Sequence, residues 1–241
     1  MTKHIGIAAC SAEGAALCYR TICSEAQAIM GRHWHPEVSL HTHPLGLYLQ
    51  TLEGKGGWQG VAQLMTDSSV RLASMGADFI ICPDNTIHQA FELAAASSPV
   101  PWLHIAEVVA AEAKQKGLTK LGVLGTRYLM EGPVYPLKLE AIDIASETPS
   151  ESDKKEINRI IFEELVNGKF NETSRQFMQE VIDVLKRRGC DGVILGCTEI
   201  PLLIEQQDSV LPVLDSTRLL ARAALLTAMQ KGSLSKIKKR K

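Results

Sequence analysis

Two residues with acid–base side chains occupy matching places in a passage that occurs twice in the chain. Cys197 lies in "LGCTEIPL" and Asp84 lies in "CPDNTIHQ", and each passage directly follows a short apolar run. A thiol and a carboxyl can both exchange protons near neutral pH when burial or a neighbouring charge shifts the pKa. The pair therefore indicates proton-transfer chemistry. Asp84 can alternatively be a polar loop residue that contacts a substrate amino group or caps the following helix.

Other reactive side chains fit a metal site poorly. The six cysteines contain no CxxC pair, which argues against a zinc ribbon and against a thioredoxin-type site. Four histidines cluster in "HWHPEVSLHTHP", where His41 and His43 share one face of a predicted strand and His33 and His35 precede it. No acid or cysteine set completes a closed ligand shell there, so we expect no metal and no other cofactor.

Short β-branched runs alternate with longer amphipathic runs, a pattern typical of βαβ units with parallel sheets. In the first half the pattern predicts helices over about residues 11–30, 58–75 and 106–117. Predicted strands are "HIGIAAC", "EVSLHT", "DFIIC" and "VPWLHI", and the second half adds "LTKLGVLGT", "DGVIL" and "VLPVL". Helical spacing also links Ile157, Ile160, Ile161 and Leu165.

The two halves of the chain are similar in sequence. "IGIAAC" at residues 5–10 aligns with "LGVLGT" at 121–126, and residues 76–87 align with 189–200 without a gap. Two blocks in the same order indicate a duplicated α/β unit, and this alignment places Asp84 opposite Cys197. We expect a first lobe of residues 1–115 plus 215–241, with a C-terminal helix and a basic tail, and a second lobe of residues 116–214.

Ligands of parallel α/β sheets bind beyond the carboxyl ends of the strands. Asp84 and Cys197 both follow strands, so lobes related by a pseudo-twofold axis would bring them to one ligand from opposite sides. That geometry suits removal of a proton from one face of a carbon and return of a proton to the other.

The motifs "PDNTIH", "GTRYLMEGPVY", "INRIIFEELVNGKF" and "LGCTEIPLL", in order between about residues 4 and 225, resemble the aspartate/glutamate racemase superfamily. The resemblance implies two flavodoxin-like lobes with the active site between them, a final helix on the first lobe, and commonly a homodimer. It also implies cofactor-independent chemistry in which two cysteines flank the substrate α-carbon. Cys197 matches the second cysteine, whereas Asp84 stands in place of the first.

The same resemblance implies the groups that bind the substrate. Asn85, Thr86 and Thr198 match the loops that hold the α-carboxylate, and Thr126 closes the pocket from the second lobe. Hydroxyl and amide donors suit an anion and the enolate-like charge that grows on deprotonation. Ser11 lies where relatives often carry a "GGM" stretch, so we expect an altered pocket wall there.

The sequence gives fewer indications of which residues recognise the side chain of the substrate. His43 and Gln50, in the expected loop after the second strand, are candidate selectors, and His88 can orient the "NTIH" loop by hydrogen bonding. Glu163 and Glu164 lie where some relatives carry a basic residue for a distal carboxylate. They either form a solvated helix face or point inward and disfavour an acidic substrate, which a negative Asp84 would also repel.

Composition narrows the remaining function classes. With 45% hydrophobic residues, 22% charged residues and a net charge of −1, we expect a cytoplasmic protein with a small-molecule partner and without nucleic-acid or membrane partners. The preferred hypothesis is a cofactor-independent, PLP-independent racemase of an aspartate- or glutamate-like amino acid. The alternatives are a single-cysteine decarboxylase or isomerase of a small diacid, and a non-catalytic amino-acid-binding relative.

Overall fold

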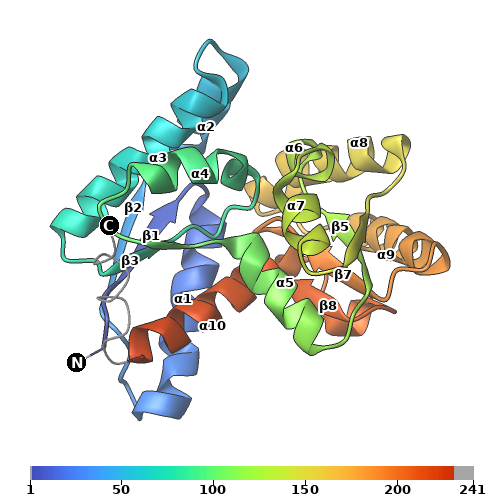
Figure 1. The fold of residues 1–241 in the computed structure, drawn as a ribbon. Coiled ribbons are helices and arrows are strands. Elements are labelled where there is room, and N and C mark those ends of the chain that lie inside the picture. The colour runs from blue at the N-terminus through green and yellow to red at the C-terminus, as the bar shows by residue number, and fades with distance from the viewer. Residues whose placement is uncertain (1, 231–241) are drawn as a thin grey trace.

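The computed structural model describes residues 2–230, and it consists of two α/β lobes joined side by side (Figure 1). The basic tail expected at residues 231–241 lies outside the described residues. Within residues 2–230, no helix combines the length and the apolar composition that crossing a bilayer requires.

Each lobe is built on a four-stranded parallel sheet, and the two sheets have the same topology. The strand orders are β2-β1-β3-β4 and β6-β5-β7-β8. The inner strands β1 and β7 are buried along their whole length, which explains their continuous apolar sequences. The predicted α/β class with two flavodoxin-like lobes is therefore confirmed. The strands are β1 Ile5–Ala9, β2 Val38–Thr42, β3 Phe79–Ile81, β4 Trp102–Leu103, β5 Lys120–Leu124, β6 Ala145–Glu147, β7 Gly192–Leu195 and β8 Val213–Asp215.

Helices cover both faces of the two sheets. The helix predicted from residue 11 is α1, and Ser11 caps it by accepting a hydrogen bond from the Gly14 amide at 3.2 Å. The helices are α1 Ala12–Met30, α2 Leu45–Glu53, α3 Gly57–Ser74, α4 Phe91–Ala96, α5 Ile105–Gln115, α6 Arg127–Glu131, α7 Val134–Glu140, α8 Glu151–Arg159, α9 Glu172–Arg187 and α10 Ser216–Met229.

The expected loop after the second strand contains a helix instead. α2 has apolar residues at Leu45, Leu49 and Leu52, the spacing of one helical face, and Tyr48 beside them is 3% exposed. Its short length and the proline at its N-cap position make it hard to recognise from local sequence. The apolar face of α2 lies against a pocket between the lobes.

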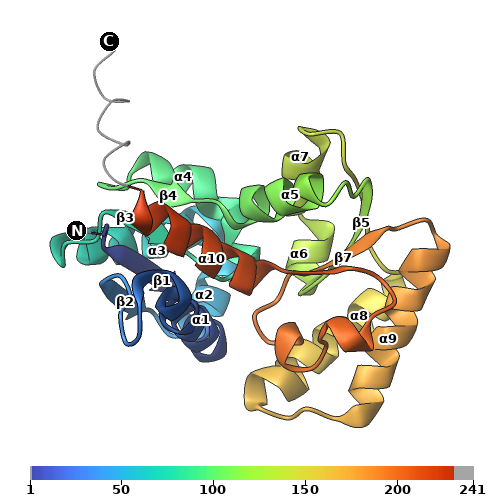
Figure 2. The ribbon, with the colours of Figure 1, turned by 90° about the horizontal axis from the view of Figure 1, so that it is seen from below.

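α5 and α10 connect the two lobes, and they lie side by side between them (Figure 2). α10 buries Leu220 and Ala224 in the core of the first sheet, together with Ile22 of α1. α5 follows the first sheet in sequence, but it buries Val109 and Ala113 in a core shared with the second sheet. The apolar contacts of these two helices therefore hold the lobes together.

Candidate active site

A pocket lies between the lobes, at the carboxyl ends of β1, β3, β5 and β7. It contains about 560 Å³ of empty space, including its opening to solvent. Asp84 enters it from the first lobe and Cys197 from the second, so both proton carriers expected from the sequence line one pocket. The lining residues are Cys10, Ser11, Leu45, Tyr48, Leu49, Leu52, Val61, Asp84, Thr86, Ile87, Thr126, Tyr128, Ile161, Phe162, Val166, Cys197 and Glu199.

Cys197 lies two residues after the end of β7 and is 7% exposed. Its Sγ donates a hydrogen bond to Glu199 Oε2 over 3.0 Å. Burial raises the pKa of the Cys197 thiol well above its ordinary value, and the negative charge of Glu199 raises it further. The free protein therefore holds Cys197 as a thiol, ready to donate a proton.

Glu199 is the end point of a hydrogen-bond chain that crosses the lobe boundary. Thr198 Oγ1 donates to Glu199 Oε2 over 2.6 Å, and Ser11 Oγ lies 3.2 Å from Thr198 Oγ1. Because the single Thr198 hydroxyl proton is given to Glu199, Ser11 is the donor in the second contact. Gly14 makes this approach possible, since a Cβ at that position would overlap Thr198 Cγ2.

Asp84 follows β3 and opens a short 3₁₀ turn, Thr86–Ala90. Its Oδ1 accepts a hydrogen bond from the Ile87 amide over 3.1 Å. Burial raises the pKa of the Asp84 carboxyl to about 6, against the opposing effect of the Ile87 amide, and the charge of Glu199 also raises it. A carboxyl with this pKa is a much better proton carrier at neutral pH than an ordinary aspartate.

His88 connects the Asp84 loop to the start of α5 through hydrogen bonds of its two ring nitrogens. Its Nε2 accepts from the Ile105 amide at 3.3 Å, so its Nδ1 carries the proton and donates to the Asp84 carbonyl at 2.7 Å. Burial, reinforced by the charge of His104, lowers the pKa of His88 to about 3, so the ring is neutral. His88 is 3% exposed and does not line the pocket, and its contacts are those of a residue that orients the loop.

The predicted carboxylate-binding residues fall into two groups. Thr86 and Thr126 line the pocket from opposite lobes, and their hydroxyl oxygens lie 2.8 Å apart. Asn85 is 2% exposed and links the lobes, since it donates to Ser216 Oγ at 3.0 Å and accepts from the Tyr135 hydroxyl at 2.6 Å. Of the other candidates, Ser11 lines the pocket and Thr198 lies behind it.

His43 and Gln50, the candidate selectors, are not among the residues that line the pocket. Asp67 of α3 lies 2.9 Å from His43 Nε2, and together with His41 it forms a group with metal-ligand spacing. The local sequence contains no acid that completes a ligand shell with these histidines, but α3 supplies Asp67 from elsewhere in the chain and brings three candidate ligands together. Arg71 Nε already contacts the same Asp67 oxygen at 2.7 Å, and the absence of a metal stays a prediction.

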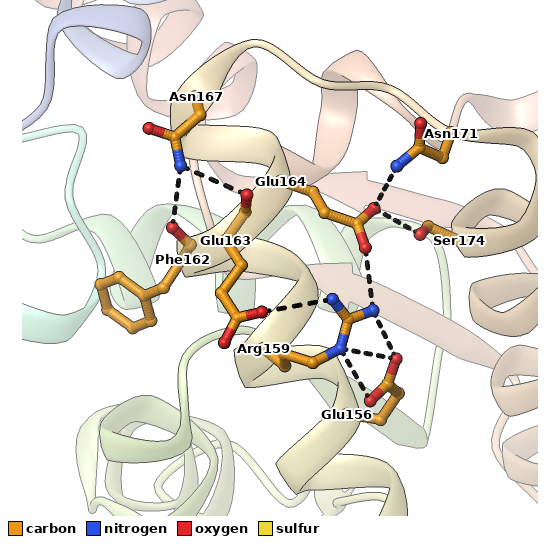
Figure 3. Close-up of polar contacts among 8 residues, drawn as sticks. All are labelled: Glu156, Arg159, Phe162, Glu163, Glu164, Asn167, Asn171 and Ser174. Atoms are coloured by element: carbon orange, nitrogen blue, oxygen red, sulfur yellow. Dashed lines mark hydrogen bonds and ion pairs between the residues drawn. The ribbon is translucent and has the colours of Figure 1, made fainter.

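Glu163 and Glu164 belong to a π-helical turn, Ile160–Glu164, that interrupts the predicted helix (Figure 3). Glu164 accepts hydrogen bonds from Arg159 at 2.8 Å, Asn171 at 2.8 Å and Ser174 at 2.6 Å. The Glu163 side chain is 67% exposed and pairs with Arg159 at 3.5 Å. Neither carboxylate lines the pocket. The structure therefore does not support the expectation that one of them points inward and disfavours an acidic substrate.

The same turn presents apolar side chains to the pocket. Ile161 and Phe162 lie within it, and Val166 lies in the 3₁₀ turn that follows it. Figure 3 shows the Phe162 ring directed away from the Glu164 network, while the Asn167 amide donates to the Phe162 carbonyl at 3.2 Å. Single π-helical turns are rare and frequently occur at functional sites.

Sequence reasoning missed three components of the site: the role of Glu199, the buried Tyr48, and the apolar walls. Only Glu199 left a local signal, because it follows Cys197 by two residues and its counterpart in the first half is the neutral Thr86. The positions of the others depend on α2 and on the π-helical turn.

Comparison with known proteins agrees with this geometry. The family model for Asp/Glu/Hydantoin racemases matches residues 7–224, so the chain belongs to this family. The broad specificity amino-acid racemase RacX of Bacillus subtilis is 25% identical over 161 residues, which cover 67% of this chain and 69% of that protein. A glutamate racemase of Desulforudis audaxviator is 27% identical over 169 residues, 67% of this chain and 60% of that protein.

Solved structures extend the similarity to nearly the whole chain. A Yersinia pestis protein assigned as an Asp/Glu racemase superposes with a TM-score of 0.86 and 38% identity, over 95% of this chain and 100% of that chain. An aspartate racemase homologue from Pyrococcus horikoshii gives a TM-score of 0.82 and 29% identity, with the same coverage.

Proposed function

We propose that this protein is a cofactor-independent amino-acid racemase in which Asp84 and Cys197 exchange protons with opposite faces of the substrate α-carbon. The observation that carries the proposal is that a carboxyl and a thiol from duplicated positions of the two lobes line one pocket. Family membership supports the reaction class. The Asp84–Cys197 pair in place of two cysteines is our inference.

The protonation states fit a pair that shares one proton. With the pKa of Asp84 raised to about 6 and that of Cys197 raised well above its ordinary value, the neutral-pH form is a carboxylate facing a thiol. Asp84 takes the α-proton, the electron pair of the C–H bond moves into the substrate carboxylate, and the Cys197 thiol protonates the opposite face. The reverse direction starts from the Cys197 thiolate and protonated Asp84.

The remaining pocket groups suit binding of an amino acid. The hydroxyls of Thr86 and Thr126 are neutral donors for the α-carboxylate and for the charge that develops on it. Glu199 is a buried acceptor that orients the Cys197 thiol, and it also attracts the substrate ammonium group. After turnover, protonated Asp84 releases its proton to solvent and the Cys197 thiolate takes one up from solvent. We infer that all of these steps use only groups of the chain, the substrate and protons from solvent.

Hydrogen exchange tests the reaction. Each common amino acid is incubated with the purified protein in deuterated water. The enantiomers are then separated, and the deuterium content of each is measured by mass spectrometry. A racemase with two separate acids gives product that carries solvent deuterium from the first turnover, while the remaining substrate stays largely protiated. Cys197→Ala is expected to abolish exchange, and Asp84→Cys to retain part of it.

The alternatives predict different outcomes. Carbon dioxide release from a substituted diacid, without α-hydrogen exchange in any amino acid, would favour the decarboxylase. Ligand binding that survives Cys197→Ala without any reaction would favour the binding protein. The expected homodimer and the cytoplasmic location stay predictions, and light scattering on the eluted protein measures the first.

A further inference from the structure

We propose that the pocket selects amino acids with a neutral, largely apolar side chain and rejects those with a side-chain carboxylate. This inference rests on the proposed racemase function and names its substrate class. The inference rests on the apolar side chains and the charged groups that line the pocket. Within the described chain, the lining residues include no Lys, Arg or His.

Two apolar surfaces face each other across the pocket. The first lobe supplies Leu45, Leu49 and Leu52 from one face of α2. The second lobe supplies Ile161 and Phe162 from the π-helical turn, together with Val166. A substrate side chain that leaves the α-carbon between Asp84 and Cys197 meets these walls, and burying apolar groups against them is favourable.

The charge in the pocket is already negative. Asp84 and Glu199 are the carboxyl groups among the lining residues, and the substrate ammonium offsets one of them. A side-chain carboxylate would bring a further negative charge without a lining cation to pair with it. Transfer of an unpaired carboxylate from water into such a site is strongly unfavourable.

The adjoining hollow does not supply the missing cation. Arg127 lines it beside Leu49, Tyr128 and Phe162, but Glu53 and Glu131 line it too. Arg127 Nε lies 2.6 Å from Glu131 Oε1, and with Glu53 this hollow holds two carboxyl groups against one guanidinium. A substrate carboxylate that reached this hollow would compete with a side chain of the protein.

Tyr48 supplies a neutral polar contact in the same pocket. Its hydroxyl is buried and has no hydrogen-bond partner within residues 2–230. The phenol does not neutralise a carboxylate as Lys or Arg would.

The test compares kcat/KM for methionine, leucine and phenylalanine with kcat/KM for aspartate and glutamate, by chiral separation and by deuterium incorporation. We expect at least about 100-fold discrimination against the two acidic amino acids, the size that unpaired polar groups produce. Calorimetric titration with the same five amino acids supplies a second readout that does not depend on turnover.

Two substitutions introduce the missing cation from opposite walls. Val166→Lys and Leu49→Lys are expected to raise kcat/KM for aspartate or glutamate, relative to methionine, by at least about tenfold. Val210→Lys and Leu47→Lys are the matched controls, since both residues are exposed, at 53% and 37%, and neither lines the pocket. The controls are expected to leave the ratio within about twofold of the wild type, and circular dichroism checks folding.

The outcomes separate this inference from the proposed function. A wild-type preference for aspartate or glutamate would overturn the substrate class and leave the racemase standing. Tighter binding of methionine or leucine without exchange in any amino acid would support the class and overturn the racemase. If none of the five binds or reacts, both inferences fail.

Discussion

Cys197 Sγ lies 3.0 Å from Glu199 Oε2, so the thiol donates a hydrogen bond to a carboxylate that is only 3% exposed. The charge of this carboxylate and the hydrogen bond it accepts both raise the pKa of Cys197. The contact therefore keeps Cys197 of the free protein in the thiol form and orients its sulfur by a hydrogen bond to a buried carboxylate.

Replacement of this carboxylate tests its role. Glu199→Gln is expected to lower kcat/KM by about 10–100-fold, because the charged acceptor that orients the thiol is lost. It is also expected to shift the pH dependence of Cys197 alkylation to lower pH, because a negative neighbour is removed. Glu163→Gln, at a side chain 67% exposed, is the matched control. An unchanged alkylation profile in Glu199→Gln would contradict the assignment.

The pH dependence of kcat/KM reports the shared proton. Since both directions need one proton on the Asp84–Cys197 pair, the profile is expected to be bell-shaped, with an acid limb near pH 6 and an alkaline limb at the raised pKa of Cys197. Activity is expected to fall about tenfold per pH unit below the acid limb. An acid limb near the ordinary aspartate pKa of about 4 would contradict the raised pKa of Asp84.

Asp84 also links stability to pH. Its folded-state pKa of about 6 lies above the ordinary value of 3.8, so its stabilising effect is complete below pH 3.8 and is lost as the pH rises through 6. Asp84→Asn removes the buried charge. At pH 8 its free energy of unfolding is therefore expected to be about 1–3 kcal/mol higher than that of the wild type. Urea unfolding at pH 8 and pH 4.5 measures the difference, which should shrink at the lower pH. Asp183→Asn, on α9, is the control.

Gly14 tests the close approach of the lobes. A Cβ in Gly14→Ala would overlap Thr198 Cγ2 and would push α1 away from the Cys197 loop. We expect a loss of about 1–3 kcal/mol in unfolding free energy and at least about a tenfold loss of kcat/KM, because small displacements of reacting groups are costly. Gly46→Ala, where an added Cβ meets nothing within 4 Å, is the control. Equal activity of both variants would argue against the contact as a determinant of geometry.

Much of the fold is predictable because its signals are local or repeated. The buried run that precedes Asp84 and the one that precedes Cys197 are strands by composition, and their gapless alignment implies two like lobes. Because parallel strands end at the same edge of a sheet, the sequence suffices to place both residues at the ligand-binding edges of the two lobes. α2 is not predicted, because it is short and begins after a proline. The π-helical turn is not predicted either, because a local widening of a helix barely changes the spacing of its apolar residues.

The residues alone therefore predict the duplicated α/β architecture and single out Asp84 and Cys197 as the candidate proton carriers, because both follow from short-range patterns. The surroundings of those carriers required the folded molecule. Whether Glu164 or Phe162 faces the pocket depends on how one irregular turn directs its side chains. Whether Asn85 binds a ligand or ties the lobes depends on Tyr135 and Ser216, which lie far away in sequence. Long-range packing, which local periodicity does not encode, decided these contacts.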